Sequence, residues 1–139
     1  MRRTLPFAMV LVVLGAASAV PAEQTKADKK GPGSYAHVVV FRMKKDAPKD
    51  AITKAIADCH ELLAKIPAVR SVRAGRPAAK GTPEVPKMKY DFALLVLLDD
   101  AEGLQAYLKH PLHLEFVKKY GPSFDMEKLQ VFDFLNQKK

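Results

Sequence analysis

Residues 90–98, YDFALLVLL, are apolar at almost every position, and this run constrains the fold more than any other part of the chain. A strand with one face in water alternates apolar and polar side chains, whereas an unbroken apolar strand is typical of burial on both faces. Such a strand needs neighbouring strands and a cover on each side of the sheet. The segment therefore predicts a sheet that is covered on both faces.

The patterns on either side of this run predict three further strands and two helical regions, the second of which is a pair of short helices. The predicted strands cover 37–43, 68–75 and 128–134, and the predicted helices cover 48–65, 99–110 and 111–119. The order is strand, helix, strand, strand, helix pair, strand. Right-handed crossovers arrange this order as a four-stranded antiparallel sheet with the helices on one face. We expect an α+β fold of the ferredoxin-like βαββαβ type.

This arrangement leaves the second face of the sheet open to water. A strand as apolar as 92–98 would then expose a large contiguous apolar patch. The simplest cover is a second copy of the same chain, packed face to face across a two-fold axis. The sequence thus predicts a homodimer through the open sheet face.

The first 22 residues have the features of a secretory signal peptide. Arg2 and Arg3 precede an apolar run, and an A-x-A triplet follows at 17–19. The apolar run is shorter than the roughly 20 residues that span a bilayer. We therefore expect cleavage and export to the periplasm or the cell exterior, without a stable membrane anchor; a retained anchor is the alternative.

Residues 23–34 carry no large apolar side chain, which predicts a disordered linker before a folded domain at 35–139. The formal net charge of the chain is +8, but the basic residues are spread along it and form no run interleaved with aromatic residues. Nucleic acid is therefore not an expected partner. Cys59 is the only cysteine, and its place on an apolar helical stripe predicts a buried core residue rather than a reactive thiol.

Two histidines flank Pro111 in KHPLHLEF (109–116). With the proline at the first helical position, His110 becomes the N-cap and His113 lies in the first turn, where the positive helix end favours a neutral imidazole. A neutral His113 can accept a proton, and Tyr107 would be placed to hydrogen-bond it or a carbonyl substrate. The alternative is that His113 is a buried structural residue bonded to a carbonyl group and that Tyr107 belongs to the core.

A metal site is the competing interpretation of these histidines. The proline pushes His110 out of the regular helical face, and a catalytic zinc commonly needs three protein ligands. Only His37 or a carboxylate such as Glu115 would complete such a set with His110 and His113, and the chain has no H-E-x-x-H or C-x-x-C motif. We expect neither a metal ion nor an organic cofactor.

Five segments together resemble the stress-responsive A/B barrel (Dabb) domain family over about residues 35–135. They are HVVVFRMK, IPAVRSVRAG, YDFALLVLLDD, AYLKHPLHLEF and VFDF. The resemblance implies a dimeric α+β barrel and a stress-related role. The family includes a plant polyketide cyclase without metal or cofactor, whose essential histidine matches His113, whose partnering tyrosine matches Tyr107, and whose further pocket histidine matches His37. Phe92 and Cys59 replace polar pocket residues of that enzyme.

Three functions follow from these observations. The first is an exported homodimer that binds a small apolar or aromatic molecule between the sheet and the helices. The expected lining of that pocket comprises His37, Val39, Phe41, Ile56, Leu94, Tyr107, His113 and Phe116. The second is a cofactor-independent lyase, cyclase or isomerase with His113 as general base and Tyr107 beside it. The third is a structural or stress-protective dimer without a ligand.

Overall fold

The computed structural model describes residues 33–81 and 88–137 as four strands and three α-helices with two short 3-10 turns. The signal-peptide range and residues 23–32 of the expected linker lie outside the described residues. In chain order the elements are β1 (Tyr35–Phe41), α1 (Ala51–Glu61), η1 (Leu63–Lys65), β2 (Ser71–Gly75), β3 (Phe92–Leu98), α2 (Ala101–Lys109), α3 (Pro111–Tyr120), η2 (Gly121–Ser123) and β4 (Gln130–Leu135).

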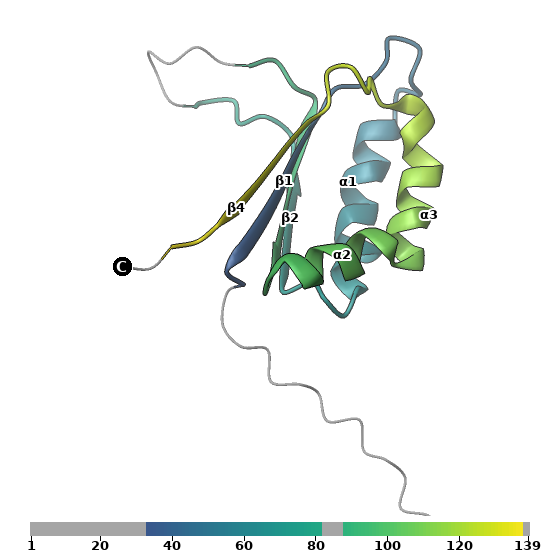
Figure 1. The fold of residues 1–139 in the computed structure, drawn as a ribbon. Helices are drawn as coiled ribbons and strands as arrows, with labels where there is room; N and C mark the ends of the chain where they lie inside the picture. Colours follow the sequence, from purple (N-terminus) through teal and green to yellow (C-terminus); the bar gives the residue numbers. More distant parts are fainter. Residues whose placement is uncertain (1–32, 82–87, 138–139) are drawn as a thin grey trace, which may run out of the picture.

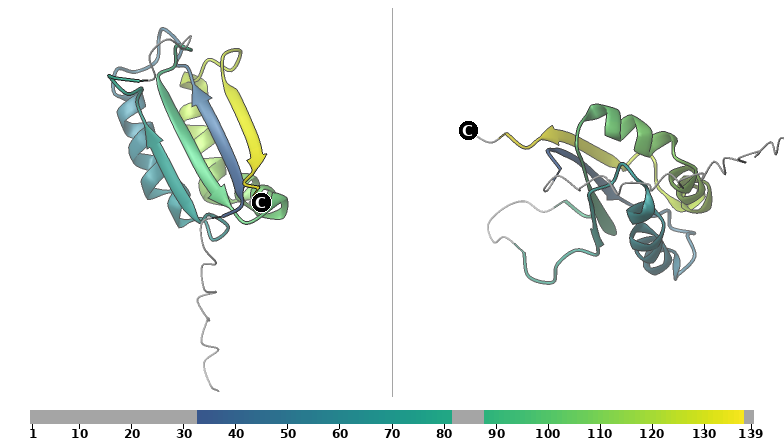
Figure 2. Two further views of the ribbon diagram at one scale, coloured as in Figure 1. Left: turned by 90° about the vertical axis from the view of Figure 1, so that its left-hand side faces the viewer. Right: turned by 90° about the horizontal axis from the view of Figure 1, so that it is seen from below.

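The four strands form one antiparallel sheet in the order β2-β3-β1-β4. All three helices lie on one side of this sheet, as Figure 1 shows. The left view of Figure 2 looks onto the other side, which no helix covers. The predicted α+β, ferredoxin-like βαββαβ fold is therefore confirmed. No helix among the described residues is long and apolar enough to cross a bilayer.

The core lies between the sheet and the helices. Along β3, alternate side chains from Phe92 to Leu98 are buried toward the helices, while Ala93, Leu95 and Leu97 on the opposite face are only partly buried. Period-two alternation of a strand explains this difference. Within one copy of the chain, only one face of the apolar run is fully covered.

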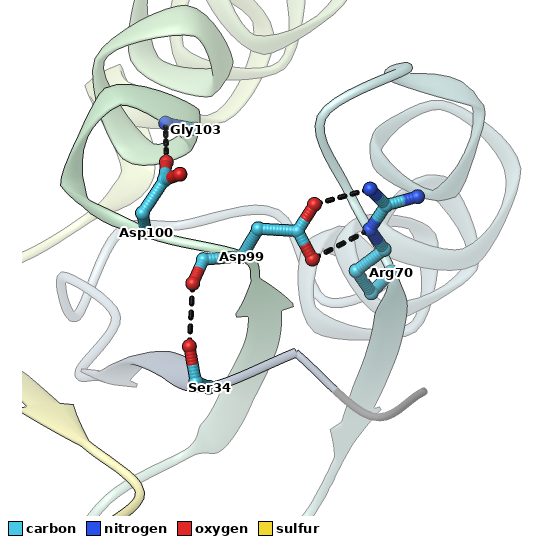
Figure 3. Close-up of polar contacts among 5 residues, drawn as sticks. All are labelled: Ser34, Arg70, Asp99, Asp100 and Gly103. Carbon is cyan, nitrogen blue, oxygen red and sulfur yellow. Dashed lines mark hydrogen bonds and ion pairs between the residues drawn. The ribbon is translucent and has the colours of Figure 1, made fainter. Parts of the chain in front are cut away.

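The junction between β3 and α2 differs from the sequence expectation, which placed the helix start at Asp99. The N-cap is Asp100, whose side chain accepts a hydrogen bond of 2.8 Å from the backbone amide of Gly103. Asp99 instead forms a two-point ion pair with the guanidinium of Arg70, and its carbonyl accepts a hydrogen bond from Ser34 (Figure 3). Two neighbouring aspartates thus have separate tasks, one in capping and one in joining β3 to the residue before β2.

Gly33 and Ser34, which we expected to belong to the linker, pack against the end of the sheet. A Cβ atom at Gly33 would lie 2.2 Å from the carbonyl oxygen of Leu98, so only glycine allows this approach. The carbonyl of Ser34 accepts a hydrogen bond from the amide of Asn136. Helix α1 is also shorter than expected, because it begins at Ala51 rather than Pro48 and ends at Glu61.

Candidate functional site

The junction between α2 and α3 places His113 beside the sheet. His110 is the N-cap of α3, as predicted, and its Nδ1 atom accepts a hydrogen bond of 3.2 Å from the amide of Leu112. In the first turn of α3, the Nδ1 atom of His113 lies 3.0 Å from the carbonyl oxygen of Leu108. Because a carbonyl only accepts, Nδ1 of His113 carries the proton and its Nε2 atom offers a lone pair when the ring is neutral.

Burial keeps His113 neutral. Desolvation lowers the pKa of His113 below its usual 6.5, the hydrogen bond to Leu108 raises it in part, and the nearby His37 lowers it further. We expected neutrality from the helix end, whereas the structure gives burial as the first cause. At pH 7 His113 is therefore a neutral hydrogen-bond acceptor.

Tyr107 lies between the two histidines of the site. It is almost fully buried, and its ring centroid lies 4.7 Å from that of His113 and 5.8 Å from that of His37. Burial raises the pKa of Tyr107 well above its usual range. Its contact with His113 is a ring contact. The phenol therefore stays protonated at neutral pH.

His37 is held by a residue that the sequence interpretation missed. The antiparallel register places His37 of β1 directly opposite Asp133 of β4. The Nδ1 atom of His37 lies 2.7 Å from a carboxylate oxygen of Asp133. This hydrogen bond keeps the proton on Nδ1 and leaves Nε2 as an acceptor in the neutral ring. The one available sequence signal was a carboxylate between two phenylalanines in VFDF.

These side chains meet at a cavity of about 200 Å³ between the sheet and helices α2 and α3. Seven of the eight expected residues line it: His37, Val39, Phe41, Leu94, Tyr107, His113 and Phe116. Ile56 does not, because it lies on α1 and packs partly buried against the core. The additional lining residues are Leu108, Val117, Gly121, Phe124, Met126, Leu129 and Val131.

The cavity has a polar region and an apolar region. His37 and Phe41 both face it from β1, and they lie four positions apart, which is roughly 13 Å along a strand. Tyr107 and His113 lie near His37, whereas Phe124 lies against Phe41, with ring centroids 4.7 Å apart. Such a site fits a molecule with one polar group and an apolar body.

Cys59 belongs to the core, as predicted. Its side chain is fully buried, and desolvation raises the pKa of the thiol to about 12. A protonated thiol of this kind is not a nucleophile. Over the described part of the chain, no group of three or more metal-ligating side chains lies close enough together to hold a metal ion.

Comparison with known proteins places the chain in a family. The profile of the stress responsive A/B barrel domain matches residues 36–136. The chain belongs to this family. It is 27% identical over 100 residues to a stress-response A/B barrel domain-containing protein of Arabidopsis thaliana, covering 72% of this chain and 84% of that one.

Solved structures share the fold of this A/B barrel protein. A dimeric ferredoxin-like protein of unknown function from Thermobifida fusca is 24% identical, with a TM-score of 0.61, covering 73% of this chain and 89% of that chain. The hydroxynitrile lyase of Passiflora edulis is 21% identical, with a TM-score of 0.63, covering 78% of this chain and 97% of that chain. At these identities the likeness shows the fold.

Proposed function

We propose that this A/B barrel protein is a homodimer that binds a small apolar or aromatic molecule in the cavity between its sheet and helices. The cavity itself carries the proposal, because apolar walls surround a few convergent polar groups. The Nε2 atoms of His37 and His113 can each accept a hydrogen bond, and Tyr107 can donate one. The ligand class that fits has a hydroxyl or carbonyl group at one end.

A titration of the purified protein with propiophenone, a neutral aromatic ketone, tests this proposal. NMR signals of residues around the cavity, such as Val39 and Phe116, should shift saturably, while those of the exposed Leu114 on α3 should not. A ligand that copurifies and is displaced by the ketone would give further support. Shifts scattered over the surface, or none from any apolar aromatic probe, would argue against a binding site.

The homodimer is supported by the sheet face that no helix covers. Several structural neighbours, from Thermobifida fusca and Bacteroides fragilis among others, are described as dimeric ferredoxin-like proteins. In this chain the same face carries exposed Phe132 and Phe134 beside Val38, Leu95 and other apolar strand residues. Light scattering during size-exclusion chromatography should give twice the chain mass; a single chain mass at micromolar concentration would contradict it.

A cofactor-independent lyase, cyclase or isomerase is the second candidate function. The observation that favours it is the grouping of His37, Tyr107 and His113 at one cavity, and a structural neighbour is a hydroxynitrile lyase. A neutral His113 would act as general base and Tyr107 would donate to a carbonyl oxygen.

Deuterium exchange at the α-carbon of propiophenone in heavy water tests this chemistry. The protein should accelerate the exchange, and His113→Ala should lower the rate roughly 100-fold or more. An unchanged rate in that variant would exclude His113 as the base. If no ketone exchanges, and no probe binds, a ligand-free structural or stress-protective dimer is the remaining function.

Export is a further part of the proposal and is supported by the signal-peptide pattern of residues 1–22. Cell fractionation followed by N-terminal sequencing should find a shortened chain in the periplasm or the medium. A full-length chain that stays inside the cell would argue against export.

A further inference from the structure

A groove at the outer edge of β2, the edge groove, is separate from the cavity that holds His37 and His113. Strand β2 is an edge strand of the sheet, and α1 packs beside it (Figure 2). The edge groove has a volume of about 320 Å³. Among the described residues that line it, Leu94 alone also lines the histidine cavity. A molecule in the edge groove would therefore occupy a different site.

The edge groove carries a positive charge. Its described lining includes His60, Arg73 and Arg76 but no carboxylate. His60 belongs to α1, and its Nε2 atom lies 3.3 Å from the carbonyl oxygen of Ala74 on β2. Because a carbonyl only accepts, this nitrogen donates, and the hydrogen bond joins α1 to the rim of the groove. The two arginines supply the charge that a ligand would meet.

Arg73 and Arg76 have no carboxylate within ion-pair distance in the described part of the chain. The two other arginines there, Arg42 and Arg70, each form an ion pair with an aspartate. A guanidinium matches a carboxylate through two parallel hydrogen bonds. The edge groove thus brings together the two described arginines whose charge the protein does not itself neutralise.

Neutral groups hold both guanidinium groups in place. The Nη1 atom of Arg73 donates to the carbonyl oxygen of Val72 over 2.9 Å and to the hydroxyl of Ser71 over 3.1 Å. The Nη2 atom of Arg76 donates to the hydroxyl of Thr53 on α1 over 3.0 Å. Each of these contacts uses one terminal nitrogen, whereas a guanidinium has five N–H donors. The side chains are therefore oriented without being neutralised.

The rest of the lining is apolar apart from the phenol of Tyr90. Val38, Ala93 and Leu95 contribute aliphatic surface, and Tyr90 adds an aromatic ring. Gly75 has no side chain, and a Cβ atom there would meet nothing within 4 Å. The edge groove therefore fits a molecule with an anionic group at one end and a small apolar or aromatic body at the other.

The homodimer proposed above would increase the need for such an anion. Arg73 pairs directly with Leu95 and so lies on the open face of the sheet. The strand residues on that face include no Asp or Glu. If a second copy covered Arg73, its guanidinium would lose water without gaining a carboxylate, which is costly. A bound anion would offset that cost.

We propose that the edge groove binds a small organic carboxylate, whose charged end pairs with Arg73 and Arg76 and whose apolar body lies against Leu95 and Tyr90. This site is additional to the ligand cavity between the sheet and the helices. All of its named groups come from one copy of the chain, so it does not depend on the homodimer. A carboxylate with an apolar body is favoured over inorganic phosphate, which would leave the apolar lining in water.

An NMR titration with benzoate tests this site. Signals of Ala74 and Leu95 should shift saturably, whereas those of Val39 and Phe116, which line the histidine cavity, should not. Benzamide has nearly the same shape without the charge and should bind roughly tenfold more weakly or worse. Inorganic phosphate has the charge without the apolar body and should also bind more weakly than benzoate.

Variants of the arginines test which side chains hold the carboxylate. Arg73→Gln and Arg76→Gln should each lower the affinity for benzoate roughly tenfold, because each removes a charged donor. Arg42→Gln is the matched control, since it removes the same charge outside the edge groove and should leave the affinity within about twofold. Arg73 and Arg76 are exposed, so their variants should keep the fold, which the signals of the buried Val96 report.

Each result decides one part of the proposal. Benzoate shifts confined to the histidine cavity, or no saturable shifts at all, would overturn the edge site and leave the proposed cavity to its own ketone titration. Equal affinity for benzamide would overturn the charge pairing, and equal affinity for phosphate would overturn the apolar contact. Unchanged affinity in Arg73→Gln and Arg76→Gln, or an equal loss in Arg42→Gln, would overturn the assignment of these two arginines.

Discussion

The Nδ1 atom of His37 on β1 lies 2.7 Å from a carboxylate oxygen of Asp133 on β4, across the antiparallel strand pair at the sheet edge. His37 is 7% exposed, so its donor has little access to water. This hydrogen bond keeps the proton of the neutral ring on Nδ1. The lone pair is then on Nε2, where a ligand in the cavity can donate to it.

Removal of the carboxylate should release this constraint. Asp133→Ala leaves the buried Nδ1 donor of His37 without its partner, which should cost about 1 kcal/mol in the free energy of unfolding. Ring ¹⁵N shifts should show a mixture of the two neutral tautomers. Asp133→Asn keeps an acceptor oxygen and serves as the control, with the Nδ1 proton retained. Identical ring signals in wild type and Asp133→Ala would show that the carboxylate does not set the tautomer.

His113 should make folding stability depend on pH. Because burial lowers the folded-state pKa of His113 below the unfolded value of 6.5, the unfolded chain binds more protons between these two values. The stability contribution of neutral His113 is thus fully present above pH 6.5 and is lost as pH falls from there through the folded pKa. Urea unfolding at about pH 5 and about pH 8 should show a smaller pH dependence in His113→Gln than in wild type. An equal dependence in both proteins would contradict burial as the cause.

Hydrogen bonds between α1 and α3 should contribute to the stability of the fold. The carboxylate of Asp58 accepts hydrogen bonds of 2.7 Å from both Lys119 and Tyr120. Burial raises the pKa of Asp58, but these two hydrogen bonds outweigh it, and the net shift is downward. Asp58→Asn should therefore lower the free energy of unfolding by about 1 kcal/mol at neutral pH. The matched control is Asp50→Asn.

The control breaks an ion pair that lies in water. The Nζ atom of Lys54 lies 2.6 Å from a carboxylate oxygen of Asp50, the residue just before α1. Both side chains are exposed to water, where such ion pairs add little to stability. Urea unfolding should show no measurable change for Asp50→Asn. If both variants lose the same free energy of unfolding, the hydrogen bonds of Asp58 between the helices stabilise the protein no more than an exposed ion pair does.

Cys59 should resist thiol reagents while the protein is folded. Full burial and a pKa of about 12 leave almost no accessible thiolate near pH 8. Ellman's reagent should react only after urea unfolds the chain. Stoichiometric labelling of the folded protein at the same pH would show that the core opens around this residue.

The strand and helix pattern was readable in the sequence because each element carries its own local signal. Pro111 marked the start of α3, and His110 proved to be its cap. Local patterns could not decide which of two neighbouring aspartates caps a helix. The N-cap of α2 is Asp100 rather than Asp99. Asp99 is held elsewhere by Arg70, a contact between residues far apart in the chain.

The lining of the cavity was also only partly predictable from local sequence patterns. Strand alternation and the family resemblance together brought His37, Leu94 and His113 to one pocket, but Ile56 faces the core from α1. The pairing of His37 with Asp133 depends on the β1–β4 register, which joins residues 96 positions apart. No periodicity within a single element carries that information.

The most direct test of ligand binding in the cavity compares two tryptophan substitutions on β4. Val131 and Leu135 are both exposed and lie on the same strand face, but only Val131 lines the cavity. The affinity for propiophenone, measured by NMR titration, should fall roughly tenfold or more in Val131→Trp, because the indole blocks the opening, and should stay within about twofold in Leu135→Trp. Equal affinities in the two variants, or no saturable binding by the wild-type protein, would contradict the account.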